Sequence, residues 1–262
     1  MSACLFDFDL TVATNGFVLG LSFSVDTGSI ALRTSQGNIH AVTLQGHRSH
    51  SSDSLSQVHQ LMLVAGVAPS DCVAVAADVG PGGFTGLRTA CGLAQGLAVG
   101  WGVPCITKTS LELLAFEQAQ RLHSTQSASG LYFSALDARQ NEVYVALHEL
   151  RGNQWFCLQV PQLRAYGSRL NEALESWGVV NGPSFYQAPL QAACGAGISH
   201  LLLDIEPTFA QAQAVPGAQA LVELAAFDAH HKNWLLPAQC QPLYVRDQVA
   251  LTTEQRKAKL HV

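Results

Sequence analysis

Short apolar runs alternate with polar turns in the first part of the chain. Three strand-like runs come first, separated by the turn sequences Asp-Thr-Gly and Ser-Gln-Gly-Asn. A helix is expected next, because Ser51, Ser52 and Asp53 are good N-cap residues and Gly66 follows its last apolar position. The expected ranges are 18–25, 29–34 and 39–45 for these strands, 52–65 for the first helix, 73–77 for a buried strand and 85–101 for a second helix.

A similar order of elements is predicted in the second half of the chain. Thr109 and Glu112 have the spacing of a capping box, which predicts a linking helix through Arg121. The elements expected after it are strands at 131–136, 143–150 and 155–160, a helix over 162–177, a strand near Val179 and a last helix opened by Pro216. Two β-β-β-α-β-α lobes in tandem predict an α/β fold of the duplicated actin and ribonuclease-H-like (ASKHA) type. The corresponding domains are an extension over 1–17, a first lobe over 18–106 plus about 214–245, a second lobe over 107–213 and a tail over 246–262.

The first predicted helix is apolar on more than one side. One face carries four apolar residues, and its last turns are apolar all round. These residues are Leu55, Val58, Met62 and Ala65 on the face, with Leu61, Leu63 and Val64 in the last turns. A helix of this pattern is usually buried on two sides.

The loop before the second helix is dense in glycine. It reads Gly80, Pro81, Gly82, Gly83, Phe84, Thr85, Gly86, Leu87 and Arg88. A Walker phosphate loop would need a lysine directly after its last glycine, and a dinucleotide loop would need the spacing G-x-G-x-x-G, so neither pattern fits. A tight strand-to-helix turn, in which glycine serves only the backbone geometry, stays open as an interpretation.

Three further glycines, Gly92, Gly96 and Gly100, fall on one face of the second helix. Each costs about 1 kcal/mol relative to alanine inside a helix, so we expect another element to pack tightly against this face. A partner and internal helix packing are both compatible with the spacing. A membrane helix is not, because residues 90–103 are too few to span a bilayer.

Composition narrows the class of protein. Of the 262 residues, 48% are hydrophobic and only 13% are charged, which indicates an unusually apolar surface or a large core. The net charge of −5 disfavours direct nucleic-acid binding. The seven cysteines never have C-x-x-C spacing, and no lysine or arginine precedes Arg33 to form the start of a signal peptide. We therefore expect a cytoplasmic protein with reduced, mostly buried thiols.

Two motifs suggest chemistry but are incomplete. Asp7, Asp9 and Thr11 have the D-x-D-x-T spacing of haloacid-dehalogenase-type phosphatases, without the later lysine and acidic pair of that chemistry. A solvated or strand-adding extension is the other interpretation of this segment. His47 and His50, near His59, lack the i, i+4 spacing of a helical metal pair. We therefore expect neither a metal site nor a catalytic residue.

Several segments together resemble the TsaB (YeaZ) family. The glycine loop and the following G-L-A-Q-G-L-A are similar to the signature G-P-G-S-F-T-G-[LV]-R and glycine helix of that family. Residues 26–32 resemble its first hairpin, and His50-Ser51 lies where an H-S or H-T pair begins its first helix. Residues 136–144 match I-D-A-R-x-x-E-V-Y, and residues 242–246 match P-x-Y-x-R. The resemblance covers about residues 18–250.

This resemblance implies a non-catalytic, two-lobed subunit that forms a heterodimer with TsaD. In that family the complex transfers a threonylcarbamoyl group to N6 of the adenosine next to the anticodon in tRNAs reading ANN codons. TsaD is expected to hold the metal and ATP, TsaE to join the assembly, and tRNA to be met only through the complex. No cofactor is expected on this subunit alone, and no membrane is involved. A homodimer is a possible state of the isolated chain.

The resemblance also implies which residues form the partner interface. They belong to the first two helices, namely Leu55, His59, Met62, Gly86, Arg88, Gly92, Gly96 and Gly100. One departure concerns Ser22-Phe23, which stand where many members carry Asp-Thr, the place of a metal–phosphate aspartate in active relatives. The other is the extension over 1–16.

Two enzymatic alternatives belong to the same superfamily. A glycoprotease-type metallopeptidase would need an H-x-x-x-H metal pair, which the sequence does not contain. A free-standing sugar or acetate kinase would need acidic phosphate-loop residues in both lobes, and Ser22 occupies the first of those places.

Overall fold

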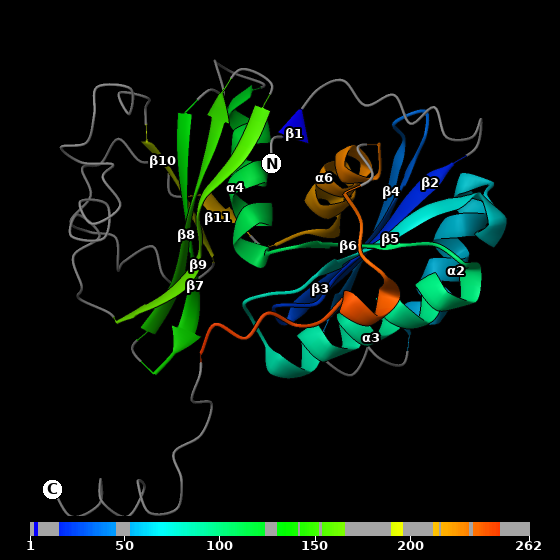
Figure 1. Ribbon diagram of the computed structural model, residues 1–262, viewed down its shortest axis with the longest axis horizontal. Coiled ribbons are helices and arrows are strands. Elements are labelled where there is room, and N and C mark those ends of the chain that lie inside the picture. Colours follow the sequence, from blue (N-terminus) through cyan, green and yellow to red (C-terminus); the bar gives the residue numbers. More distant parts are fainter. Residues whose placement is uncertain are drawn as a thin grey trace, which may run out of the picture.

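Two β-sheets form the framework of the protein, which was analysed as a computed structural model (Figure 1). Each sheet has its own helices, and two of these helices lie between the sheets. The residues that the structure describes are 3–4, 16–45, 53–123, 130–140, 142–151, 154–165, 190–195, 212–214, 216–230 and 233–246.

The first sheet has the strand order β4-β3-β2-β5-β6. Its strands are β2 (Phe17–Ser22), β3 (Thr27–Thr34), β4 (Ile39–Gln45), β5 (Cys72–Asp78) and β6 (Cys105–Lys108). β2, β3 and β4 form an antiparallel meander, whereas β5 and β6 run parallel to β2.

The second sheet repeats this arrangement with one added strand. Its order is β1-β9-β8-β7-β10-β11. Its strands are β1 (Ala3–Cys4), β7 (Gly130–Arg139), β8 (Glu142–Arg151), β9 (Gln154–Ala165), β10 (Leu190–Gly195) and β11 (Ala212–Ala214). β7, β8 and β9 are again an antiparallel meander, and β10 and β11 continue parallel to β7. When β1 is left out and the strands of each sheet are numbered as they appear in the chain, both sheets have the strand order third, second, first, fourth, fifth. The duplicated ASKHA-type fold is therefore confirmed.

The N-terminal extension contributes the short edge strand β1. It pairs antiparallel with β9, with Ala3 opposite Trp155 and Cys4 opposite Gln154. The strand-adding interpretation therefore holds for these two residues. Asp7, Asp9 and Thr11 lie outside the described residues.

Helices cover both faces of the first sheet. The helices of the structure are α2 (Ser54–Ala65), α3 (Phe84–Trp101), α4 (Ser110–His123) and α6 (Ala218–His230), with 3₁₀ turns η1 (Pro69–Asp71) and η4 (Pro237–Gln239). α2 and α3 pack on one face of the first sheet and α6 on the other. α4 packs on the second sheet and also contacts α6, so α4 and α6 lie between the sheets (Figure 1).

Alternation along β2 explains how the first sheet binds helices on both faces. Phe17, Leu19 and Leu21 point into the core beneath α2 and α3, while Val18 points toward α4 and α6. Gly20 lies on the α6 side, where an added Cβ would lie 2.7 Å from Val222 Cγ1. Glycine at this position therefore permits the close approach of α6 to the sheet.

The local signals for helix ends agree with the structure. α2 begins after Asp53 and ends at Gly66, which takes the left-handed φ of 69°. The Thr109 Oγ1 accepts a hydrogen bond from the backbone N–H of Glu112 at 3.1 Å, as expected for the start of α4.

Two sequence predictions are wrong. The helix predicted from Gln162 does not begin there, because β9 continues to Ala165 and pairs with β8. The end of β9 has the apolar spacing of a helix, but its pairing with β8 stabilises the strand conformation more strongly. The remainder of that predicted helix and the strand near Val179 lie outside the described residues. The helix α2 is also not buried on two sides within this chain, since Leu55, Leu63 and Val64 are exposed.

Candidate partner-binding site

The glycine loop is a close contact between the start of α3 and the end of β2. An added Cβ at Gly86 would lie 1.8 Å from the Phe23 carbonyl oxygen, and one at Gly82 would lie 2.3 Å from that of Ser24. The Gly83 N–H donates to the Ser24 carbonyl at 2.6 Å. Gly80 takes a φ of +100°, which L-residues rarely adopt. These glycines therefore serve backbone geometry, in agreement with the tight-turn interpretation.

The glycine stripe on α3 behaves differently. An added Cβ at Gly92, Gly96 or Gly100 would meet no described atom within 4 Å. All three glycines are exposed, so the alternative of internal helix packing against this face is wrong for the described part of the chain. Within the described part of the chain, no contact therefore compensates the free-energy cost of three helical glycines.

Exposed apolar side chains accompany the glycines on α2 and α3. Leu55, Leu63 and Val64 of α2 are 59%, 60% and 70% exposed, and Val99 of α3 is 70% exposed. We call the exposed residues of these two helices the outer helix surface; it comprises Leu55, Ser56, His59, Gln60, Leu63, Val64, Phe84, Thr85, Arg88, Gly92, Gly96, Val99 and Gly100. Such a concentration of exposed apolar residues is typical of an interaction site.

Two residues expected at the interface do not lie on the outer helix surface. Met62 is only 6% exposed, because it packs in the core beneath the helices. Gly86 is buried against Phe23. Both residues were expected in the partner interface, but the contacts they make are inside the chain. His59 is exposed on α2, whereas His47 and His50 lie outside the described residues.

Arg88 is held in one orientation at the start of this surface. Its Nε donates a hydrogen bond to the Tyr244 hydroxyl at 2.9 Å. The guanidinium carbon lies 3.8 Å from the centre of the Phe84 ring, a cation–π geometry. The Phe84 and Tyr244 rings are themselves 5.7 Å apart. The signature loop and the C-terminal P-x-Y-x-R segment, which the sequence presents as separate motifs, are thus one structural unit.

The same C-terminal segment also reaches the second lobe. The Leu243 N–H donates to the Val79 carbonyl at 2.8 Å, which fixes the segment beside β5. Arg246 then donates to the Ala138 carbonyl and the Gln140 side chain, each at 2.9 Å, and forms an ion pair with Glu142. The segment therefore joins α3 to the β7–β8 hairpin.

A buried carboxyl group lies where the glycine loop, β2 and α4 meet. Asp78 is 0% exposed. Its Oδ1 accepts hydrogen bonds from the Ser110 hydroxyl at 2.6 Å and the Gly80 N–H at 2.9 Å. Its Oδ2 lies 2.9 Å from the Ser22 Oγ, which in turn lies 3.0 Å from the Pro216 carbonyl oxygen.

Burial favours the neutral form of Asp78. The single hydroxyl proton of Ser22 can be donated either to Asp78 Oδ2 or to the Pro216 carbonyl oxygen, since both lie within hydrogen-bond distance. Burial raises the pKa of Asp78, and hydrogen bonds from the Gly80 N–H and from three serine hydroxyls, those of Ser110, Ser24 and Ser22, oppose that effect. A carboxyl group therefore does lie beside Ser22, supplied by the neighbouring strand, in surroundings that favour its uncharged form.

A second buried polar group lies in the second lobe. Lys108 and Glu112 form an ion pair at 3.1 Å with little exposure. His148 is 1% exposed and stacks on Trp155, with ring centres 5.5 Å apart. Burial lowers the pKa of His148 to about 4, so it is uncharged at neutral pH. His148 is closed off from solvent, whereas Lys108 and Glu112 keep a small exposed fraction.

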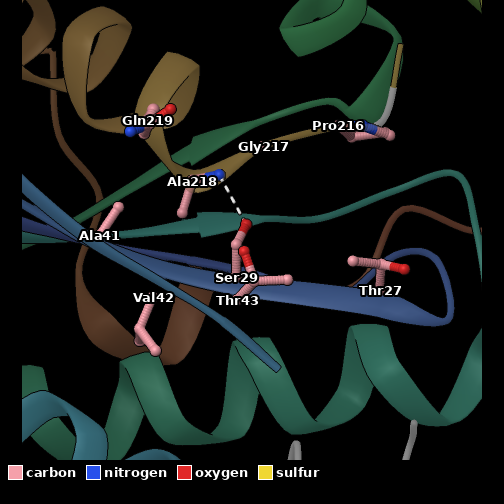
Figure 2. A pocket seen from close by; sticks show the side chains of 9 residues that line it. All are labelled: Thr27, Ser29, Ala41, Val42, Thr43, Pro216, Gly217, Ala218 and Gln219. Atoms are coloured by element: carbon pink, nitrogen blue, oxygen red, sulfur yellow. Dashed lines mark hydrogen bonds between the residues drawn. The ribbon is translucent and has the colours of Figure 1, made fainter. Parts of the chain in front are cut away.

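A small pocket of about 280 Å³ lies at the start of α6 (Figure 2). Ser29, one of its hydroxyl-bearing residues, accepts a hydrogen bond from the Ala218 N–H at 2.9 Å and so caps the helix. The described residues that line it are Thr27, Ser29, Ala41, Val42, Thr43, Pro216, Gly217, Ala218 and Gln219. None of these described residues has an acidic or basic side chain, so they provide no acid or base that could activate the hydroxyl groups of the pocket.

Three further properties of the described residues concern metal ligands, thiols and membrane-spanning helices. Nowhere in the described ranges do three His, Cys, Asp or Glu side chains come together as they would around a metal ion. The five cysteines whose side chains are described are free thiols, and four of them are buried. Among the described residues, no helix has the length and apolar character needed to cross a bilayer.

Comparison with known proteins identifies the family. A model of the family described as TsaD, tRNA N6-adenosine threonylcarbamoyltransferase, matches residues 36–160. The tRNA threonylcarbamoyladenosine biosynthesis protein TsaB of Haemophilus influenzae is 27% identical over 88% of this chain and 94% of its own length. YeaZ from Pseudomonas aeruginosa superposes with a TM-score of 0.72 at 26% identity, covering 87% of this chain and 99% of that protein. These matches support assignment of the chain to the TsaB (YeaZ) family.

A second TsaB matches a shorter part of the chain. The Escherichia coli protein of the same description is 31% identical over 132 residues, which is 50% of this chain and 54% of that protein.

Sequence analysis did not identify two of the residues described above. Asp78 ends a buried parallel strand just before the glycine loop, and that position was the available signal for a carboxyl group at the lobe junction. Tyr244 was noted only as part of a motif, and nothing in its spacing indicates that it contacts Arg88.

Proposed function

We propose that this chain is the non-catalytic partner subunit of a TsaD-type enzyme in tRNA threonylcarbamoyladenosine biosynthesis. Its role is to bind TsaD through the outer helix surface and thereby support threonylcarbamoyl transfer to N6 of the adenosine next to the anticodon. In this proposal TsaD holds the metal, ATP and adenylate, and TsaE joins the assembly. This chain interacts with tRNA through the complex. The proposal places this activity in the cytoplasm.

The observation that carries the proposal is the character of α2 and α3. Between them these helices have one charged residue, Arg88, although they cover the outside of the first sheet. Leucine and valine side chains stand beside three glycines that no part of the described chain covers. A helix of a partner can approach closely over glycine and bury the neighbouring apolar side chains, as in a stable protein interface.

The neutral lobe junction is consistent with a subunit without its own nucleotide chemistry. A metal–phosphate site needs an ionised carboxylate to bind the cation. In this chain Ser22 and the buried Asp78, whose neutral form is favoured by burial, occupy the corresponding place, and both are engaged in internal hydrogen bonds. The proposal therefore assigns nucleotide chemistry to the partner.

Substitution of Gly96 tests the proposal, because stability and binding should change in opposite directions. An added side chain at Gly96 meets no described atom within 4 Å. Gly96→Ala and Gly96→Leu should therefore stabilise the isolated chain by up to about 1 kcal/mol, through helix propensity. Binding to purified TsaD should weaken with side-chain size, since overpacking an interface costs about 1–3 kcal/mol or more.

The control is Gln219→Leu, which adds the same side chain at an exposed position of α6, on the other face of the first sheet. Thermal melting, co-elution with TsaD and the content of threonylcarbamoyladenosine in tRNA from a complemented TsaB-deficient strain are measured for each variant. A stable Gly96→Leu protein that binds TsaD like the wild type contradicts the proposal. Self-association that is lost in Gly96→Leu while TsaD binding persists would assign the surface to a homodimer instead.

A further inference from the structure

We infer that Arg88 binds a carboxylate of the partner subunit and so determines which partner fits the outer helix surface. This inference rests on the proposed function and adds the chemistry of recognition to it. Arg88 is the one charged residue in α2 and α3, and it lies in the first turns of α3, four residues before Gly92. Any partner that covers the glycine stripe also comes close to this guanidinium.

The side chain of Arg88 is oriented before a partner arrives. Phe84 holds the flat face of the guanidinium at 3.8 Å, and the Tyr244 hydroxyl accepts from Nε at 2.9 Å. Tyr244 is fixed in turn, because Leu243 bonds to Val79 and Arg246 bonds to the β7–β8 hairpin. Since the rotamer is already selected, binding loses less side-chain entropy than it would with a free arginine.

The terminal nitrogens of Arg88 remain available for a ligand. Within the described part of the chain, Arg88 has one hydrogen bond, through Nε, and contacts with two aromatic rings. The two NH₂ groups therefore present a planar pair of donors at an exposed position. This geometry matches the two oxygens of a carboxylate, and arginine is accordingly enriched at the energetic centres of interfaces.

Burial of Arg88 in an interface requires a carboxylate of the partner to compensate its charge. Covering the outer helix surface removes water from Arg88, and a buried guanidinium without an anionic partner is strongly unfavourable. No residue of α2 or α3 carries a negative charge that could compensate it. The compensating charge must therefore come from the partner, as an Asp or Glu side chain.

The test compares TsaD binding by wild type, Arg88→Lys and Arg88→Gln at low and high salt. Arg88→Gln should weaken binding about a hundredfold, as expected for loss of one member of a buried, hydrogen-bonded charge pair. Arg88→Lys should recover only part of that loss, because an ammonium cannot form the planar two-nitrogen contact. Arg139→Gln is the control, since it removes an exposed arginine, 82% exposed, from the β7–β8 turn of the second lobe. It should bind like the wild type.

A second variant identifies the carboxylate itself. Arg88→Glu should abolish binding. Selection for TsaD variants that restore tRNA modification in the presence of Arg88→Glu should yield substitutions that replace an Asp or Glu of TsaD by Lys or Arg. Equal binding by Arg88→Gln and wild type, full recovery by Arg88→Lys, or suppressors that never map to a TsaD carboxylate would each overturn the inference. None of these three results contradicts the proposed function, as long as the wild type binds TsaD. If the wild type does not bind TsaD, both the inference and the proposed function are wrong.

Discussion

The buried acid Asp78 gives the most quantitative prediction for this protein. Replacement by asparagine keeps the shape of the side chain and every hydrogen bond that a neutral acid makes. The amide NH₂ can donate to Ser22 Oγ, and the amide oxygen can accept from the Ser110 hydroxyl and the Gly80 N–H. We therefore expect Asp78→Asn to be tolerated at neutral pH.

Asp78→Ala should behave in the opposite way. It removes the acceptor of the Ser110 hydroxyl and of the Gly80 N–H, while Ser22 keeps its bond to Pro216. A buried donor without a partner costs about 1–3 kcal/mol, so the two together cost about 2–6 kcal/mol of unfolding free energy. The comparison of Asn with Ala separates the loss of hydrogen bonds from the loss of an ionisable group.

The pH dependence follows from the direction of the pKa shift. Burial raises the pKa of Asp78 in the folded chain above its value of about 3.9 in an unfolded chain. The folded state thus binds more protons than the unfolded state between these two pKa values. The stabilisation is fully present below the unfolded pKa and decreases by about 1.4 kcal/mol per pH unit as pH rises toward the folded pKa.

Urea unfolding of wild type and Asp78→Asn at about pH 5 and about pH 8 measures this effect. The free energy of unfolding of Asp78→Asn relative to wild type should increase with pH, because asparagine does not titrate. An infrared carboxylic-acid C=O band present in wild type and absent from Asp78→Asn should report the proton directly. A variant that is several kcal/mol less stable than wild type at high pH, with the difference vanishing at low pH, would show that Asp78 is ionised and would refute the raised pKa.

Two further predictions concern the glycine loop and the C-terminal segment. Gly86→Ala should destabilise the chain by about 1–3 kcal/mol or more in thermal melting, because its Cβ would lie 1.8 Å from the Phe23 carbonyl oxygen; a normal melting temperature would show that this contact relaxes freely. Arg246→Gln should lower the unfolding free energy by about 1–3 kcal/mol and speed amide hydrogen exchange at Leu243, since it breaks the bonds to Ala138 and Glu142. Unchanged exchange at Leu243 would mean that the segment is held by its contact with β5 alone.

The sequence determined the elements whose causes are local. Turn residues and apolar runs specified the strands of both meanders, and Gly66 ended α2 where a left-handed residue was needed. The glycine loop was recognisable because short-range backbone geometry needs glycine at fixed spacing. Local apolar spacing failed at Gln162, where hydrogen bonding to β8 across the sheet decides the conformation.

Only the tertiary structure decided which residues meet across long separations in the chain. Two glycines of the same helix have opposite roles, since Gly86 is pressed against Phe23 whereas an added Cβ at Gly96 would meet no described atom within 4 Å. Arg88 and Tyr244 are brought together by the packing of the C-terminal segment beside β5. Folding removes water from Asp78 and so favours its neutral form, while hydrogen-bond donors of α4 and β2 oppose this effect. Local propensity acts over a few residues, whereas burial and proton sharing depend on the assembled chain.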